Sequence, residues 1–104
     1  MKNILILILL FSLNAFSQEP TLLYMNSSWN SKNDYKYLGS IKGVKIVKVD
    51  YDSQPKKFKE KIKSVPAIIL FDRNKKLKKI WQAGISMKLI LDPKEIQKIV
   101  DIIK

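Results

Sequence analysis

Pro66 stands directly before the apolar run Ala67–Phe71, and this pairing restricts the fold more than any other feature of the sequence. A proline cannot continue a helix, because it lacks the backbone N–H and its ring clashes with the preceding turn. It is tolerated, however, at the first residue of a strand. The lysine-rich segment that follows Pro55 must therefore end before Pro66 if it is helical, and we predict a buried strand over 67–71.

Three further segments have the composition of strands. Apolar or β-branched runs occupy 21–25, 44–49 and 77–81, and such runs are typical of strands. The polar segment 72–76 separates the last run from the strand expected over 67–71, so these two strands should form an antiparallel hairpin. The sequence thus predicts four strands.

Helix signals separate these runs. A short helix of about two turns is expected over 34–38, after polar residues that can cap it. Pro55 suits the first turn of a second helix. The last helix is the best defined, because Asp92 can cap it, Pro93 suits its first position, and Glu95 completes a capping box. Apolar residues then recur on one face of this terminal helix, as expected for packing on a sheet.

Residues 1–17 have the pattern of a secretory signal peptide. They contain Lys2, an apolar run over 4–13, and small residues just before Gln18. The apolar run is shorter than the ~20 residues of a comfortable membrane span. We therefore expect cleavage, a single domain over 18–104, and a secreted or periplasmic protein. An uncleaved membrane anchor is the minor alternative.

The sequence contains neither cysteine nor histidine. Without cysteine it can form no disulfide and offers no thiolate nucleophile. Without histidine it lacks the commonest general base and metal ligand. We therefore expect no catalytic residue, metal site or cofactor. Asp50 and Asp52 could in principle help to bind calcium, but we interpret them as residues that close a strand and cap a helix.

The chain is strongly basic. Lys2 would be lost with the signal peptide, which leaves 19 of the 20 basic residues against 9 acidic ones. All but Arg73 of the basic residues are lysine, which favours diffuse charge over bidentate recognition of phosphate. The charge could simply cover a soluble surface, or it could attract an acidic protein or anionic membrane lipid. Nucleic acid is an improbable partner for a secreted domain.

The central part of the chain resembles the thioredoxin superfamily. The matching features are the Val49–Asp50 step at a strand end, Pro55 near the next helix start, and Val65–Pro66 before an apolar strand. The resemblance implies an α/β, thioredoxin-like three-layer sandwich, with a central mixed sheet of about four strands flanked by about three helices. It also implies a cis peptide bond at Pro66, which in this superfamily faces the active-site loop and helps to bind extended chains.

The resemblance places Trp29 where thioredoxins have the tryptophan that precedes two active-site cysteines. Asn30 and Asn33 then stand where the cysteines would be, so the superfamily's redox chemistry should be absent. What remains is the substrate-binding face, which we expect to hold a protein or extended peptide. The partner-binding residues implied in this way are Trp29, Asn30, Ser31, Lys32, Asn33, Val65 and Pro66.

Three functional interpretations remain open from the sequence. The first is a redox-inactive secreted domain that acts as a binding or scaffolding module. The second is a basic surface-charge module that binds acidic envelope components, and the third is a superfamily enzyme with non-cysteine chemistry, for which the loop offers no activated side chain. The basic surface of the second interpretation comprises Lys56, Lys57, Lys59, Lys61, Lys63, Lys75, Lys76, Lys78 and Lys79.

Overall fold

A computed structural model describes residues 19–104 of the chain. The predicted signal peptide over 1–17, together with the alternative of a membrane anchor, lies outside the described residues. The element boundaries given below are those of the structure.

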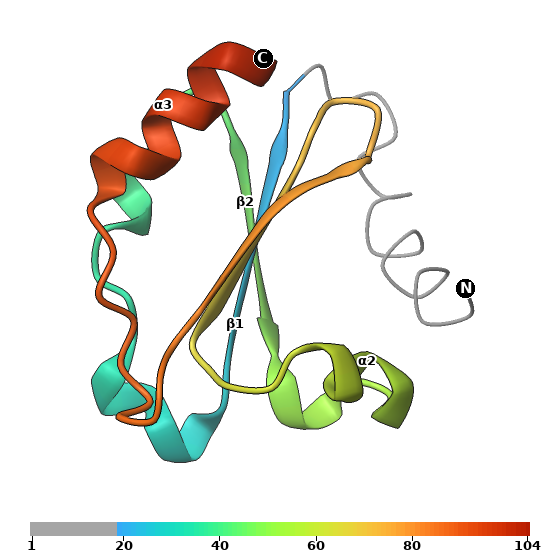
Figure 1. Ribbon diagram of the computed structural model, residues 1–104, viewed down its shortest axis with the longest axis vertical. Coiled ribbons are helices and arrows are strands. Elements are labelled where there is room, and N and C mark those ends of the chain that lie inside the picture. Colours follow the sequence, from blue (N-terminus) through green and yellow to red (C-terminus); the bar gives the residue numbers. More distant parts are fainter. Residues whose placement is uncertain (1–18) are drawn as a thin grey trace.

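A four-stranded mixed sheet forms the centre of the molecule (Figure 1). Its strands are β1 (Thr21–Asn26), β2 (Lys45–Asp50), β3 (Ala67–Phe71) and β4 (Leu77–Gln82), arranged in the order β2-β1-β3-β4. β1 is parallel to β2 and antiparallel to β3, and β4 is antiparallel to β3. The four strands expected from the sequence, including the hairpin, are confirmed.

Helices connect and cover the strands. Within residues 19–104, two are α-helices, α2 (Lys56–Lys61) and α3 (Pro93–Ile103), and three are short 3₁₀ helices, η1 (Ser28–Asn33), η2 (Leu38–Ser40) and η3 (Tyr51–Ser53). α3 and α2 lie on opposite sides of the sheet (Figure 1). The α3 face of the sheet packs around Leu22 and Ile68, and the α2 face packs around Leu23 and Ile69. The result is a three-layer α/β arrangement.

The helix expected over 34–38 is wrong. η1 ends at Asn33, Asp34 has an extended backbone, and η2 begins only at Leu38. The reason lies in two side-chain contacts: the hydroxyl of Tyr24 accepts a hydrogen bond from the backbone N–H of Tyr35 at 2.9 Å and donates one to the carboxylate of Asp34 at 2.7 Å. The Tyr35 N–H and the Asp34 carboxylate, which could have taken part in a helix start, are thus bonded to Tyr24 of β1.

The terminal helix begins at the residue that the sequence indicates, but without the expected capping box. The carboxylate of Asp92 accepts a hydrogen bond from the backbone N–H of Lys94 at 2.9 Å, and Pro93 occupies the first helical position. The carboxylate of Glu95 does not bond back to Asp92 and instead accepts a hydrogen bond at 2.9 Å from the indole N–H of Trp81 on β4. This bond fixes the start of α3 against the sheet.

The packing of α3 gives a stability prediction with an internal control. Ile96 is fully buried, whereas Ile102 on the same helix is 74% exposed. Ile96→Ala should lower the free energy of unfolding by about 2–5 kcal/mol, because it removes buried methyl groups and leaves a cavity. Ile102→Ala should change it by less than about 0.5 kcal/mol. Urea denaturation of both variants measures the difference, and equal losses would contradict the packing described.

Candidate functional site at the Trp29 loop

Three segments meet at one end of the sheet. η1 follows the carboxyl end of β1, the Val65–Pro66 pair precedes the start of β3, and the loop 83–92 follows the end of β4 (Figure 1). They meet because β3 is antiparallel to both β1 and β4, so its first residue lies beside the last residues of its neighbours. All residues expected from the sequence to bind a partner lie in two of these segments.

The side chain of Asn30 joins the three segments. It is only 2% exposed. Its Nδ2 atom lies within hydrogen-bond distance of Asn26 Oδ1 (3.2 Å), of the Val65 carbonyl oxygen (3.3 Å) and of the Met87 carbonyl oxygen (2.9 Å). Its Oδ1 atom accepts a hydrogen bond at 2.8 Å from Asn33 Nδ2. One amide therefore bonds to groups of β1, η1, the segment before β3 and the loop after β4.

A second set of polar contacts joins η1 and Asp34 to β1. Asn26 Nδ2 donates to the carboxylate of Asp34 at 2.7 Å and to the carbonyl of Asn30 at 3.2 Å. Burial, and then the hydrogen bond to Asp34, raises the pKa of the Tyr24 hydroxyl well above its usual range. Tyr24 therefore stays protonated and remains a donor to Asp34 at any ordinary pH. These contacts hold the middle and the end of η1 against β1.

The residues around Pro66 are enclosed. The Val65–Pro66 peptide bond is cis, and both side chains are buried. The carbonyl of Pro66 accepts a hydrogen bond at 3.0 Å from the backbone N–H of Ala83, and the Val65 carbonyl faces Asn30. An added peptide strand would pair with the carbonyls of Val65 and Pro66. Both carbonyls already accept hydrogen bonds from within the chain.

The structure divides the expected partner-binding residues into two groups. Trp29 is 63% exposed, and Ser31 and Lys32 are exposed as well, while Asn33 is half-buried. The second group, which is buried and holds the loop in place, consists of Asn30, Val65 and Pro66.

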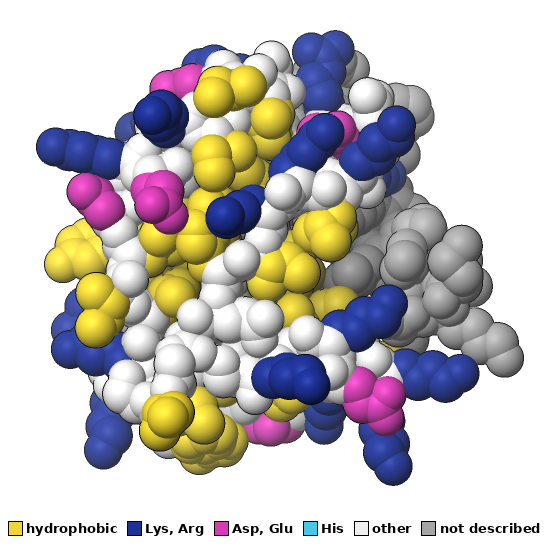
Figure 2. All heavy atoms as spheres, viewed as in Figure 1, with side chains coloured by type: hydrophobic (Ala, Val, Ile, Leu, Met, Phe, Trp, Pro, Cys, Tyr) yellow, Lys and Arg dark blue, Asp and Glu magenta, His cyan; other side chains and the backbone are white. Residues whose placement is uncertain are grey.

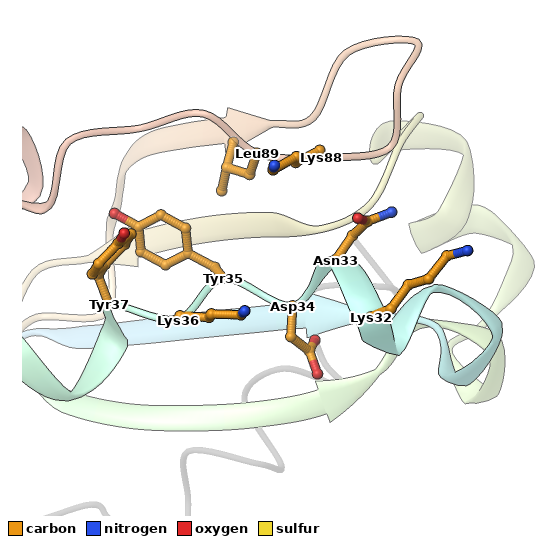
Figure 3. A pocket seen from close by; sticks show the side chains of 8 residues that line it. All are labelled: Lys32, Asn33, Asp34, Tyr35, Lys36, Tyr37, Lys88 and Leu89. Atoms are coloured by element: carbon orange, nitrogen blue, oxygen red, sulfur yellow. The ribbon is translucent and has the colours of Figure 1, made fainter.

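A hollow beside η1 extends the exposed part of the site. It has a volume of about 230 Å³, and Figure 3 shows the Tyr35 and Tyr37 rings below Leu89 at one end and Lys32 at the other. Tyr35 is anchored because its hydroxyl donates to the Leu91 carbonyl at 2.7 Å, and the Tyr37 ring meets it edge-on at 5.6 Å. The full lining is Lys32, Asn33, Asp34, Tyr35, Lys36, Tyr37, Lys88 and Leu89.

A second hollow continues along the loop toward α3. It has a volume of about 530 Å³ and shares Tyr37, Lys88 and Leu89 with the first. Exposed apolar side chains accompany the two hollows, namely Trp29, Tyr37, Ile85 and Ile90. Figure 2 shows hydrophobic side chains on the lower edge and left side of the molecule, where η1 and the loop 83–92 lie in Figure 1.

Sequence reasoning missed the contribution of the loop 83–92. Its residues Ile85, Leu89 and Ile90 are apolar but follow neither a strand nor a helix period, so no element was assigned to them. Apolar residues in a segment without regular structure can indicate an interaction surface, and this was the one signal in the sequence that pointed to the loop.

The two basic segments expected from the sequence are separate. α2, which carries Lys56, Lys57, Lys59 and Lys61, lies at the lower end of the molecule in Figure 1, and the β3–β4 hairpin tip lies at the opposite end of the sheet. They therefore form two basic regions and not one face.

Asp50 and Asp52, at the end of β2 and just after it, accept hydrogen bonds from neighbouring side chains. Ser27 Oγ donates to the carboxylate of Asp52 at 3.2 Å, and the Asp50 carbonyl accepts from the side chains of Ser53 and Gln54 at 3.1 Å each. Residues 19–104 contain no group of three or more metal-binding side chains. In the same part of the chain, the longest helix has 11 residues, and none has both the length and the apolar character needed to cross a membrane.

The asparagine network can be tested by unfolding. Asn30→Ala leaves the buried Val65 carbonyl and the partly buried Met87 carbonyl without this donor, and each unpaired buried polar group costs about 1–3 kcal/mol. The variant should therefore be less stable than the wild type by at least about 1 kcal/mol. Ser31→Ala, at the next and exposed position, is the matched control. Thermal unfolding that gives the same stability for both variants would contradict the structural role of Asn30.

The comparisons with known proteins concern the fold alone. No protein-family model matches the chain, and no curated protein matches its sequence. Among solved structures, a disulphide isomerase from Xylella fastidiosa Temecula1 is similar with a TM-score of 0.50 and 16% identity, covering 77% of this chain and 73% of that one. A yeast mitochondrial 1-Cys peroxiredoxin is similar with a TM-score of 0.57 and 18% identity, covering 89% and 87%.

Both similar proteins are named for thiol chemistry, which this chain cannot perform because it has no cysteine. The strand order, the two covered sheet faces and these similarities agree with the resemblance noted in the sequence. The chain therefore has a thioredoxin fold without the thiols of a thioredoxin.

Proposed function

We propose that this chain is a redox-inactive binding module that holds a protein or extended peptide at the Trp29 loop and the adjoining hollows. The observation that carries the proposal is the 63% exposure of Trp29. Tryptophan is enriched among the residues that dominate binding energy, and exposed apolar groups beside a concave surface are typical of interaction sites. The predicted signal peptide supports a secreted or periplasmic location for this activity.

In the proposed site, one set of residues holds the loop in place and another set contacts the partner. Asn30, Val65 and Pro66 are buried and hold the loop, so that Trp29 and Lys32 need little reordering when a partner binds. A preformed surface lowers the entropic cost of association. The partner would lie against Trp29, Ser31, Lys32 and Asn33 and continue into the hollow lined by Tyr37 and Leu89.

The charges around the site favour an acidic partner. Lys32, Lys36 and Lys88 line the first hollow. Its carboxylate, Asp34, is bonded to Tyr24 and Asn26. Lysines of this kind accelerate and orient the approach of an acidic surface, while the apolar contacts supply most of the binding energy. Binding should therefore weaken with salt but persist at high salt.

This proposal differs in two expected results from the basic surface-charge module. If the lysines alone carried the affinity, binding would collapse at high salt, because exposed charges are screened beyond about 10 Å at 0.1 M salt. The binding affinity would also not depend on Trp29. Salt dependence and a tryptophan variant together separate the two functions.

The test is capture of partners from an envelope extract on the immobilised full chain, followed by identification by mass spectrometry and measurement of Kd for each partner. Trp29→Ala should weaken a salt-resistant partner by about 2 kcal/mol, or about thirtyfold in Kd, as for a central interface residue. Ile102→Ala removes an equally exposed apolar side chain on α3 and should leave the Kd unchanged.

Two results would contradict the proposal. One is a set of partners that bind Trp29→Ala and the wild type equally well. The other is binding that disappears entirely at high salt for the wild type, which would favour the surface-charge module.

A further inference from the structure

The β3–β4 hairpin tip shares its end of the sheet with the point where the described chain enters the fold. Thr21, near the first described residue, pairs with Phe71 at the end of β3. The hairpin tip follows directly after Phe71, and both lie at the end of the sheet opposite to η1 (Figure 1). In the sequence, the apolar run 4–13 precedes this entry point.

The turn at the tip directs its one acidic group inward. The carboxylate of Asp72 accepts hydrogen bonds from the backbone N–H groups of Asn74 at 2.8 Å and Lys76 at 2.9 Å, and it is 3.5 Å from Lys78 Nζ. Asp72 is buried, whereas every residue from 73 to 80 is exposed. The outward surface of the tip is therefore basic, and Figure 2 shows Lys and Arg side chains around it at the upper right.

A bulge in the hairpin places two apolar side chains among these cations. Phe71 pairs with Leu77 and Leu70 pairs with Lys79, so Lys78 is an extra residue in β4. Because of this extra residue, Leu77 and Ile80 lie on the same face, and they are 54% and 37% exposed. Lysines on an edge strand also discourage pairing with other sheets, but that role explains neither the exposed Leu77 nor the basic residues of the turn.

We propose that this hairpin surface, defined by Arg73, Lys76, Leu77 and Ile80, docks on an anionic lipid membrane. Basic side chains attract anionic headgroups, and apolar side chains among them enter the interface between headgroups and acyl chains. The described chain enters the fold at this same end, and the expected signal peptide over 1–17 precedes that point in the sequence. Docking there leaves the Trp29 loop facing away from the membrane. The inference is independent of the function proposed above.

Because the sequence has no cysteine, a single introduced cysteine can be labelled specifically. A single cysteine is introduced into the full chain either at the tip, as Asn74→Cys, or on the exposed side of α2, as Lys57→Cys, and is labelled with an environment-sensitive dye. Each protein is mixed with phosphatidylcholine vesicles that carry a lipid-bound quencher, with or without phosphatidylglycerol. We expect the tip dye to be quenched by the phosphatidylglycerol vesicles only, and the α2 dye by neither kind.

Quenching of both dyes alike, of the α2 dye alone, or of neither dye would overturn the proposal. Quenching of the tip dye by both kinds of vesicle would also overturn it, because the attraction to anionic lipid would then be absent.

A pair of charge variants provides a second readout. Arg73→Gln with Lys76→Gln should lower the partition coefficient onto phosphatidylglycerol vesicles by about thirtyfold, or about fivefold for each basic residue at the surface. Lys57→Gln with Lys61→Gln removes the same charge at the other end and should lower it by less than about twofold, because screening confines the attraction to about 10 Å from the membrane. Equal losses for the two pairs would show that only net charge matters and would refute a docking surface at the hairpin.

Discussion

The buried side-chain amide of Asn30 is the interaction on which the arrangement of the functional end depends. An amide can donate and accept at once, and Asn30 uses both capacities, with Val65 and Met87 on the donor side and Asn33 on the acceptor side. The resemblance to thioredoxins implies a cysteine at this position. In this chain the position holds an amide that bonds three segments together.

The sequence predicts most of the fold because its strongest signals are local. Pro66 before an apolar run marks the start of β3, and Asp92 with Pro93 marks the start of α3, where side chain and backbone interact within a few residues. The segment 34–38 was predicted wrongly for the converse reason. Its backbone is bonded to Tyr24, a residue of β1, and no local pattern indicates such a tertiary contact.

The candidate site was predictable in location but not in its details. The resemblance placed Trp29 and Pro66 at the same end of the sheet, and the structure has them there. It could not indicate that Asn30 is buried while Trp29 is exposed, because neighbouring residues of a 3₁₀ helix can face opposite ways. The contribution of Leu89 was missed because the loop 83–92 has no period from which burial could be read.

If Asn30 is a structural group held inside the loop, its side-chain amide protons should be protected from exchange with solvent. By NMR in the full chain, the Nδ2 protons of Asn30 should exchange with solvent far more slowly than those of Asn74, which lies exposed in the hairpin turn. Equally fast exchange at the two residues would contradict the account, since the Asn30 amide would then be open to water and could not hold the three segments together.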